Sequence, residues 1–426
     1  MFITKNENIQ NKKNLYIIAF ISFLNALTFA AIIPILYSYA SSFGLNDSQI
    51  GFLFGSFALA QFFATPIIGR LSDKYGRKPL LLISLFGTFI ANIMQGFAAN
   101  VWVLFLARIL DGITGGNNSV AQAVISDMTK EKDRPMGFAL FGASFGIGFL
   151  IGPVIVLLII PFGNNFVFFF SAFVALVATI LTALFLPETN FNRETKKLDF
   201  IDTVFLQIYR GFQMPVVRDI LIINLISSLS IAIFQIAFQP YIKVNFGMGE
   251  REISYVLILV GLINIVFLPL VKIFTNKFGL NNLLKWTFLI IALNFLILAL
   301  FVDTIVFWSM MVVFGFVNLF SRPVVTSLLI KYSRKEDQGV AIGVLESMFS
   351  LGLAVGPAMF ALVNLPTKEE FTFLKLPFIT DILIDSAKNY TLSFFVVGLI
   401  SFCVWLYVLW FTKKLDYIGT TIENNF

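Results

Sequence analysis

Four charged side chains stand inside apolar stretches that are each long enough to cross a membrane: Arg108, Asp111, Arg322 and Glu346. A charge at the centre of a bilayer costs at least about 2.5–3.5 kcal/mol, so each of these residues is a candidate for function. A carboxylate in such a place can exchange a proton, because burial raises its pKa toward neutrality. The chain has no histidine, the side chain that usually titrates near pH 7. Any proton coupling therefore falls on Asp111 or Glu346.

The positions of these residues allow two ion pairs. Asp111 follows Arg108 by one helical turn. Asp111 then either pairs with Arg108 in one state of a cycle and takes up a proton or substrate in another, or it forms a permanent pair that only neutralises two buried charges. Arg322 and Glu346 fall at comparable depths of neighbouring stretches, so they can either pair or stay apart. Paired, Glu346 is a static partner; unpaired, it is a second proton site and an anchor for a cationic substrate.

A short charged segment, GRLSDKYGRKP, separates two of the apolar stretches and begins at Gly69. Gly69 and Gly76 allow close approach and a sharp turn between two membrane helices. Asp73 is placed to cap the incoming helix, while Arg77 and Lys78 face water. One alternative is a basic loop that only marks the cytoplasmic side. The spacing of glycines and charges favours a specific motif.

The composition requires an integral membrane protein. Hydrophobic residues make up 58% of the 426 residues and charged residues 13%, with a mean hydropathy of +0.88, whereas soluble domains carry about 25% charged residues. A membrane helix needs about 20 apolar residues. Twelve stretches qualify, near residues 15–40, 48–69, 79–99, 101–127, 136–160, 165–187, 219–242, 252–275, 283–302, 304–331, 339–363 and 390–412.

Several classes of function are excluded. The glycine-rich segments GASFGIGFLIGP and SLGLAVGP lie inside apolar stretches and lack a following Lys-Ser/Thr, so they are not phosphate loops. An ion gradient rather than ATP is therefore the expected energy source. The only cysteine, Cys403, leaves no disulfide or cysteine metal site to consider. We expect no enzyme activity, no cofactor, no metal and no nucleic-acid partner.

The basic residues set the orientation in the membrane. With the N-terminus inside, most of the 30 lysines and arginines fall on the cytoplasmic side. Those left outside are Lys243, Arg251, Lys368, Lys375 and Lys388. Both termini are therefore expected in the cytoplasm.

The chain contains two related halves. Thr129–Asp133 aligns with Ser333–Asp337, and the same offset pairs two glycine–proline motifs. The paired residues are Gly148, Gly152 and Pro153 with Gly352, Gly356 and Pro357. Small residues let membrane helices pack closely, and the prolines are expected to kink them. A long charged interruption predicts six-helix bundles at residues 1–187 and 219–426, joined by a cytoplasmic loop at 188–218.

Over essentially its whole length the chain resembles bacterial major facilitator superfamily transporters, and among them the drug:proton antiporters that include the tetracycline efflux proteins. The resemblance rests on GRLSDKYGRKP after the second stretch, ARILDGITGG in the fourth and GIGFLIGP in the fifth. It implies an all-α membrane fold of twelve helices in two pseudo-symmetric bundles. It also implies that Asp73 holds the cytoplasmic end closed against the eleventh helix and that Arg77 pairs with Asp127.

The match also has departures. Many drug antiporters carry an acid in the first helix where this chain has Asn25, and paired glycines are missing after Pro153. A second copy of the charged segment, Lys272–Asn282, has Asn276 in place of Asp73 and lacks the Arg-Lys pair. The charged gate is therefore expected in the first half only.

Uncharged polar residues recur in the helices that line the central cavity of this fold. The candidate cavity residues are Asn25, Asn118, Gln122, Asn224, Gln235 and Gln239. For each of them the alternative is an interhelical hydrogen bond, worth about 0.6 kcal/mol.

The resemblance implies a secondary active transporter that works by alternating access, with proton-coupled export of small amphipathic compounds or drugs. An importer or uniporter of a polar metabolite on the same fold is an alternative, and a non-transporting membrane sensor is another. We expect a monomer in the bacterial cytoplasmic membrane. Its expected partners are a small-molecule substrate, protons and the lipid bilayer.

Overall fold

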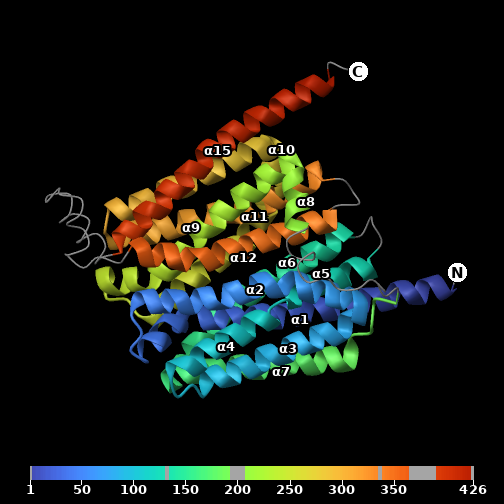
Figure 1. Ribbon diagram of the computed structural model, residues 1–426, viewed down its shortest axis with the longest axis horizontal. Coiled ribbons are helices and arrows are strands. Elements are labelled where there is room, and N and C mark those ends of the chain that lie inside the picture. The colour runs from blue at the N-terminus through green and yellow to red at the C-terminus, as the bar shows by residue number, and fades with distance from the viewer. Residues whose placement is uncertain (1, 130–133, 192–206, 334–337, 364–389, 424–426) are drawn as a thin grey trace. The chain divides into compact units, whose positions relative to one another are not determined.

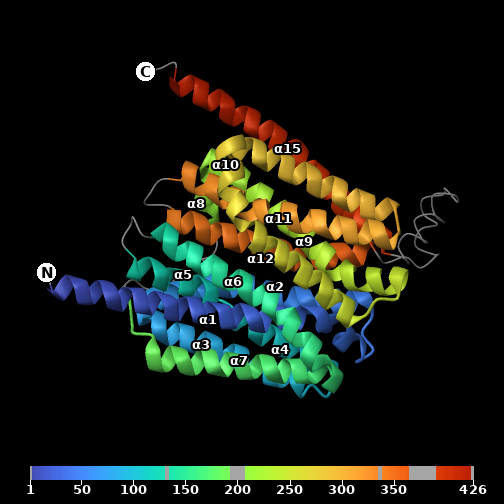
Figure 2. The same cartoon turned by 180° about the vertical axis from the view of Figure 1, so that it is seen from behind.

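The computed structural model describes residues 2–129, 134–191, 207–333, 338–363 and 390–423. In these ranges every regular element is a helix (Figures 1 and 2). Three of the basic residues predicted outside the membrane, Lys368, Lys375 and Lys388, lie outside the described residues. Most of the aligned segments Thr129–Asp133 and Ser333–Asp337 and the middle of the predicted loop at 188–218 also lie outside the described residues.

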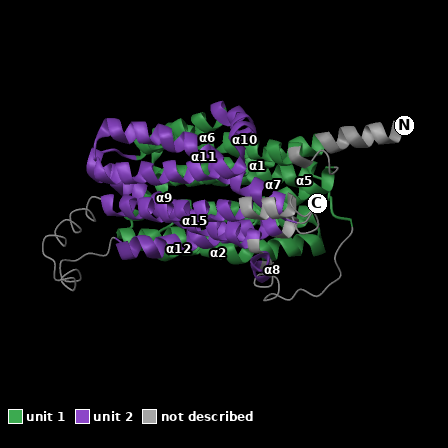
Figure 3. Ribbon diagram, turned by 90° about the horizontal axis from the view of Figure 1, so that it is seen from above, with its two compact units in different colours: residues 1–206, 250–265 green, residues 207–249, 266–426 purple. Residues whose placement is uncertain are grey.

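The chain groups into two compact units, coloured separately in Figure 3. The first contains residues 1–206 and 250–265, and the second contains residues 207–249 and 266–426. The boundaries that the repeat suggested for the two bundles stay a prediction.

The first unit is built around its N-terminal helix. Its helices are α1 (Phe2–Ser41), α2 (Asp47–Tyr75), α3 (Arg77–Gly96), α4 (Val101–Thr114), α5 (Asn117–Met128), α6 (Arg134–Ile159), the 3-10 turn η1 (Ile160–Phe162) and α7 (Asn164–Phe185). α1 packs along α6 and α7, α3 packs along α7, and α2 packs along α4. α1, α3 and α7 lie side by side in both views. Ile35, Leu53 and Phe168, from α1, α2 and α7, are fully buried in its core.

The second unit is built around α9. Its helices are α8 (Gln207–Gln213), α9 (Pro215–Phe246), α11 (Thr304–Tyr332), α12 (Gln338–Val363), α15 (Thr391–Glu423) and the later part of α10 (Glu250–Leu300). α9 packs along α12 and α15. Phe234 of α9 joins four helices, because its ring centroid lies 5.1 Å from those of Phe295 and Phe314 and 5.9 Å from that of Phe394.

The described helices account for all twelve predicted membrane crossings. Ten of them are long and apolar enough to span a bilayer. The fourth predicted crossing is divided into α4 and α5, each too short to be counted alone. α10 has 51 residues and covers two crossings, with a non-helical residue, Gly279, between them. The predicted all-α, twelve-helix membrane fold is confirmed.

Local sequence explains where key helices begin and end. Asn46 caps α2 and exchanges hydrogen bonds with Gln49 in a capping box. α2 ends at Gly76, whose φ of 111° a residue with a Cβ rarely adopts. In α10 the matching residue of the repeat, Gly279, has φ 74°. Both turns therefore require glycine.

The glycines of the repeated glycine–proline motif lie where two helices meet. A Cβ on Gly148 or Gly152 of α6 would lie 2.7 Å from the Cβ of Ala26 or Ala30 of α1, respectively. Gly352 and Gly356 of α12 approach α9 in the same way, where an added Cβ would overlap Ser228 and Ala232. These glycines permit the close packing of the two helix pairs. The prolines that follow them lie inside α6 and α12, and the expected kinks stay predictions.

Candidate functional site

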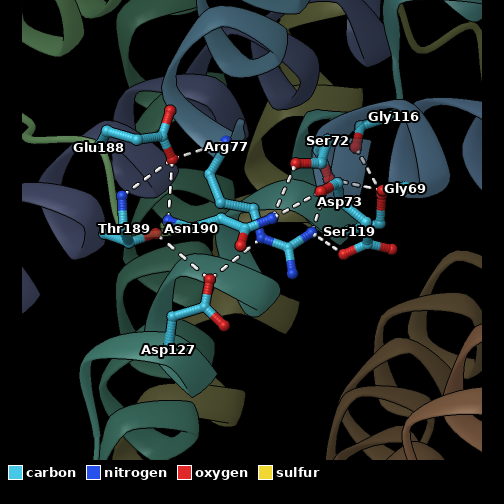
Figure 4. A network of polar contacts seen from close by, with 10 residues as sticks. All are labelled: Gly69, Ser72, Asp73, Arg77, Gly116, Ser119, Asp127, Glu188, Thr189 and Asn190. Carbon is cyan, nitrogen blue, oxygen red and sulfur yellow. Dashed lines mark hydrogen bonds and ion pairs between the residues drawn. The ribbon is translucent and has the colours of Figure 1, made fainter. Parts of the chain in front are cut away.

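Arg77 holds together the turn between α2 and α3 (Figure 4). Its Nη1 lies 2.5 Å from Asp73 Oδ1 and donates to Ser72 Oγ at 2.7 Å. Its Nε donates to Asp127 Oδ2, near the end of α5, at 3.0 Å. The structure thus brings Arg77 and Asp127 together, and it adds Ser72 to the contact. We call Ser72, Asp73, Arg77 and Asp127 the loop cluster; its role as a gate and the contact of Asp73 with the eleventh helix stay predictions.

Glu188, which was not a sequence-based candidate, caps the first turn of α3. Its carboxylate accepts the backbone N–H groups of Arg77 at 2.8 Å and Lys78 at 3.2 Å. It also accepts those of Thr189 and Asn190, at 2.9 Å each. The free N–H groups at the start of a helix need such acceptors. Glu188 thus supplies acceptors for the first turn of α3, and capping of this helix by Asp73 stays a prediction.

The two glycines of the charged segment differ in importance. Gly76 adopts a positive φ, and a Cβ there would collide with the Glu188 carboxylate. Gly69 lies inside α2, and an added Cβ would meet nothing within 4 Å. Its predicted part in the turn is therefore wrong; its carbonyl accepts the Ser72 hydroxyl at 2.6 Å. Lys78 donates its Nζ to the carbonyl of Ala183, at the end of α7, at 2.8 Å.

The four N–H donors decide the ionisation of Glu188. Burial alone raises the pKa of its carboxyl group, but the backbone hydrogen bonds from Asn190, Arg77, Thr189 and Lys78 outweigh burial and hold the pKa below its usual value. A lowered pKa in the folded state stabilises the fold above the unfolded pKa, and this stabilisation is lost as the pH falls through the folded value.

We expect Glu188→Gln to lower the melting temperature of the detergent-solubilised protein at pH 7 by about 1 °C, because a loss of about 1 kcal/mol acts against the unfolding entropy of all 426 residues. The gap between the melting temperatures of wild type and variant should shrink as the pH falls below about 4.3, the unfolded pKa of Glu, because the unfolded chain takes up a proton there and the folded carboxylate does so only at lower pH. Glu250→Gln is the matched control, since that side chain makes no hydrogen bond with the described residues. A gap that is constant from pH 7 to pH 3 would contradict the assignment.

The Arg108–Asp111 pair is enclosed within the first unit. Arg108 Nη1 lies 3.5 Å from Asp111 Oδ2, and the two side chains are only 4% and 8% exposed. The guanidinium carbon of Arg108 lies 4.4 Å from the centre of the Phe57 ring. Arg108 Nε is buried and has no acceptor among the described residues. The expected pair is present, but its geometry is loose.

The fourth crossing is broken directly after this pair, where a continuous helix was expected. α4 ends at Thr114 and α5 begins at Asn117. The carbonyls freed by the break are satisfied from neighbouring helices: Ser84 donates to that of Thr114, and Gln61 donates to that of Gly115 at 3.2 Å. Irregular backbone inside a membrane is tolerated only with such partners. The continuous helix expected over residues 101–127 is therefore divided, with Arg108 and Asp111 on α4 and Asn118 and Gln122 on α5.

Three asparagines form a hydrogen-bonded group between α1 and α5. Asn117 Nδ2 donates to Asn25 Oδ1 at 2.7 Å, and Asn25 Nδ2 lies 3.3 Å from Asn118 Oδ1. Asn117 was not a sequence-based candidate. The group lies directly after the break, at the start of α5, whereas the Arg108–Asp111 pair lies before it on α4.

The other cavity candidates are scattered. Asn224 donates to the carbonyl of Leu345 at 2.8 Å. This is an interhelical hydrogen bond, the role given above as the alternative to lining a cavity. Gln122 is half-buried, Gln235 is exposed and Gln239 is buried. Their role in a substrate cavity stays a prediction.

Arg322 and Glu346 form an ion pair, the first of the two alternatives left open above, but Arg322 is not buried. Arg322 Nη2 donates to both Glu346 oxygens, at 2.5 and 2.7 Å. The side chains are 56% and 31% exposed, so the expectation of two buried charges is wrong for Arg322. More than half of the Arg322 side-chain surface is therefore left uncovered, although its guanidinium is paired with Glu346.

A further charged group, missed by the sequence reasoning, joins α9 to α15. Asp219 is 1% exposed and lies 2.7 Å from Lys414 Nζ. It also accepts the Tyr407 hydroxyl at 3.0 Å and lies 3.5 Å from Arg218 Nε. With two cations and a hydroxyl around one carboxylate, the group is well compensated and is suited to holding the last helix in place.

Comparison with known proteins gives one consistent picture. A sequence model described as the Major Facilitator Superfamily matches residues 18–357 and 220–420. The tetracycline resistance protein, class H, of Pasteurella multocida is 29% identical over 363 residues, covering 82% of this chain and 89% of that protein. Multidrug resistance protein 1 of Bacillus subtilis is 30% identical over 353 residues, covering 81% and 89%. The crystal structure of the human organic anion transporter MFSD10 shares the fold, with a TM-score of 0.72 at 18% identity, covering 93% of this chain and 99% of that one.

Proposed function

Because the chain belongs to the Major Facilitator Superfamily, we propose that it exports small amphipathic compounds in exchange for protons. The protein is a multi-pass membrane transporter and not an enzyme. The two relatives named for resistance to tetracycline and to multiple drugs support drugs as the exported compounds. Alternating access, in which a central site opens to one side of the membrane at a time, is the mode expected of this fold.

The observation that carries the proton coupling is the loose, enclosed Arg108–Asp111 pair. Its 3.5 Å separation is longer than the 2.7–2.9 Å typical of a strong charged hydrogen bond. The Phe57 ring beside Arg108 offers the cation a second stabilising partner. Asp111 can therefore take up a proton without leaving Arg108 wholly uncompensated. The Arg322–Glu346 pair, at 2.5 and 2.7 Å, is much tighter and less suited to repeated opening.

The two helices of the fourth crossing, α4 and α5, have different roles in this proposal. Asp111, on α4, binds and releases the proton. Asp127, near the end of α5, belongs to the loop cluster, which holds one end of the first unit together through Arg77. Protonation of Asp111 ends its ion pair with Arg108 and favours a different packing of α4, so that proton uptake accompanies substrate release.

The location follows from the charge distribution and the relatives. We place the protein in the bacterial cytoplasmic membrane with both termini in the cytoplasm, because most lysines and arginines then lie on the inner side. The loop cluster is then at the cytoplasmic end. The chain acts as a monomer in this proposal, with a small molecule and protons as its partners.

Everted membrane vesicles that contain the protein and a pH-sensitive dye test the proposal. After the vesicles are acidified by respiration, tetracycline, norfloxacin and ethidium are added in turn. We expect at least one compound to release protons from the vesicles and to accumulate inside them until an uncoupler is added. Vesicles without the protein are the control. Entry that stops at equal concentrations on both sides and that an uncoupler does not change would favour a uniporter, and no response to any compound would contradict drug export.

A further inference from the structure

Arg322 exposes a charge deep inside a membrane-spanning helix. α11 runs from Thr304 to Tyr332, so Arg322 lies roughly 15 Å from the nearer end at 1.5 Å per residue. Its side chain is nevertheless 56% exposed. A guanidinium at that depth cannot face lipid at an acceptable cost, so its exposed part faces a space that water or a solute can enter.

The guanidinium has donors to spare. Arginine carries five N–H donors in a planar fork. Only Nη2 is engaged by Glu346, and it serves both carboxylate oxygens. Within the part of the chain that the structure describes, Nε and Nη1 make no hydrogen bond to protein. Three N–H donors of Arg322 are therefore available to a ligand.

An aromatic ring lies beside the guanidinium, and two polar residues lie one turn from Arg322 along α11. The guanidinium carbon of Arg322 lies 5.1 Å from the centre of the Phe349 ring, one turn beyond Glu346 on α12. Asn318 and Thr326 lie one turn on either side of Arg322 on α11, and both are half-buried. A cation, a carboxamide, a hydroxyl and an aromatic ring thus occur together on two packed helices.

From this arrangement we propose that Arg322, Glu346 and Phe349 form a subsite for the carboxylate of an amphipathic substrate with a planar ring system. The carboxylate accepts from Nη1 and Nε of Arg322, and the ring system packs against Phe349. Glu346 positions the guanidinium and competes with the ligand for its charge. This inference rests on the proposed export function and names the class of compound that is exported.

The free hydrogen-bond donors of Arg322 favour an anionic ligand over a cationic one. Both oxygens of Glu346 already accept from Arg322, and its side chain is 31% exposed against 56% for Arg322. A cationic ligand would have to displace a short ion pair, whereas a carboxylate binds donors that are already free. Glu346 is therefore the positioning residue and Arg322 the binding residue.

Direct binding to the purified protein tests this independently of transport. The probes are norfloxacin, whose carboxylate sits on a planar ring, and its methyl ester, which lacks that charge. We expect wild type to bind the acid at least about tenfold more tightly than the ester, the effect of one charged hydrogen-bonded contact. Arg322→Gln should abolish the preference, and Arg322→Lys should keep only part of it because lysine lacks the planar fork. Lys331→Gln, an exposed cation on the same helix, is the control and should bind as wild type does.

Binding to the variant Glu346→Gln distinguishes a carboxylate subsite from a site that anchors a cationic substrate. Removing the competing carboxylate should strengthen binding of the acid several-fold, whereas a cation anchor would lose affinity for ethidium. Equal binding of acid and ester by wild type, or weaker acid binding by Glu346→Gln, would overturn the subsite. These outcomes leave the vesicle test of export unaffected. If the subsite is found but no compound moves protons, the export proposal fails and the subsite stands.

Discussion

Asp111→Asn is expected to reduce substrate-induced proton release in everted vesicles to the level of vesicles without the protein. Asparagine keeps the shape of the side chain but cannot bind or release a proton. The variant also leaves Arg108 without its carboxylate, and breaking a buried pair in this way costs about 3–5 kcal/mol. The measurement therefore includes the amount of folded protein in the membrane, and rates are expressed per folded molecule.

Two companion variants keep this prediction open to contradiction if Asp111→Asn folds poorly. Arg108→Gln combined with Asp111→Asn removes both charges, so the fold should recover while coupling stays absent. Asp111→Glu retains the acid and should keep measurable coupling. If the double variant still exchanges protons for substrate, the pair is only a structural neutralisation and Asp111 is not the coupling acid.

Arg77→Ala is expected to cause the second-largest loss. Arg77 has three partners, Asp73, Ser72 and Asp127, and its side chain is only 12% exposed. Hydrogen bonds to a charged group contribute about 1.5–3 kcal/mol each when little exposed. Substitution of Arg77 takes a charged partner from both carboxylates at once, so we expect a clear fall in melting temperature and slow export by protein that is still folded.

Substitution by lysine is the sharper test of the loop cluster. Arg77→Lys keeps the positive charge, but a single ammonium cannot reproduce a planar fork that reaches three acceptors. Most of the loss should therefore persist. A double-mutant cycle of Arg77→Ala and Asp127→Ala measures the pairwise energy, expected at about 1–3 kcal/mol. Additive effects of the two substitutions would mean that the Arg77–Asp127 contact contributes nothing.

Much of the fold could be predicted because membrane crossings have strong physical signals. About 20 apolar residues are needed to cross the bilayer, and charged interruptions mark where a helix leaves it. The break between α4 and α5 could not be predicted in this way, since VWVLFLARILDGITGGNNSVAQAVI reads as one apolar stretch. The two adjacent glycines, Gly115 and Gly116, were the only sign. Their effect depends on Ser84 and Gln61, which come from other helices and accommodate the open carbonyls.

The candidate site was predicted best where partners are close in sequence or implied by the family motif. Arg108 and Asp111 are one turn apart, and the pairing of Arg77 with Asp127 followed from the resemblance. Glu188 was missed because its partners are backbone N–H groups, which have no signature in sequence. A carboxylate directly after Pro187, just beyond an apolar stretch, was the available signal. The exposure of Arg322 depends on tertiary packing, which spacing along one helix does not determine.

The divided fourth crossing has a consequence for counting. At 1.5 Å per residue α4 is about 21 Å long and α5 about 18 Å, so neither alone reaches across a hydrocarbon core of about 30 Å. A count that drops both pieces but divides α10 at Gly279 arrives at eleven crossings, an odd number. Odd parity would send the two ends of the chain to opposite sides of the membrane and reverse the assigned side of every later connection. The break at Gly115 and Gly116 therefore determines which side of the membrane is assigned to each connection in the second half of the protein.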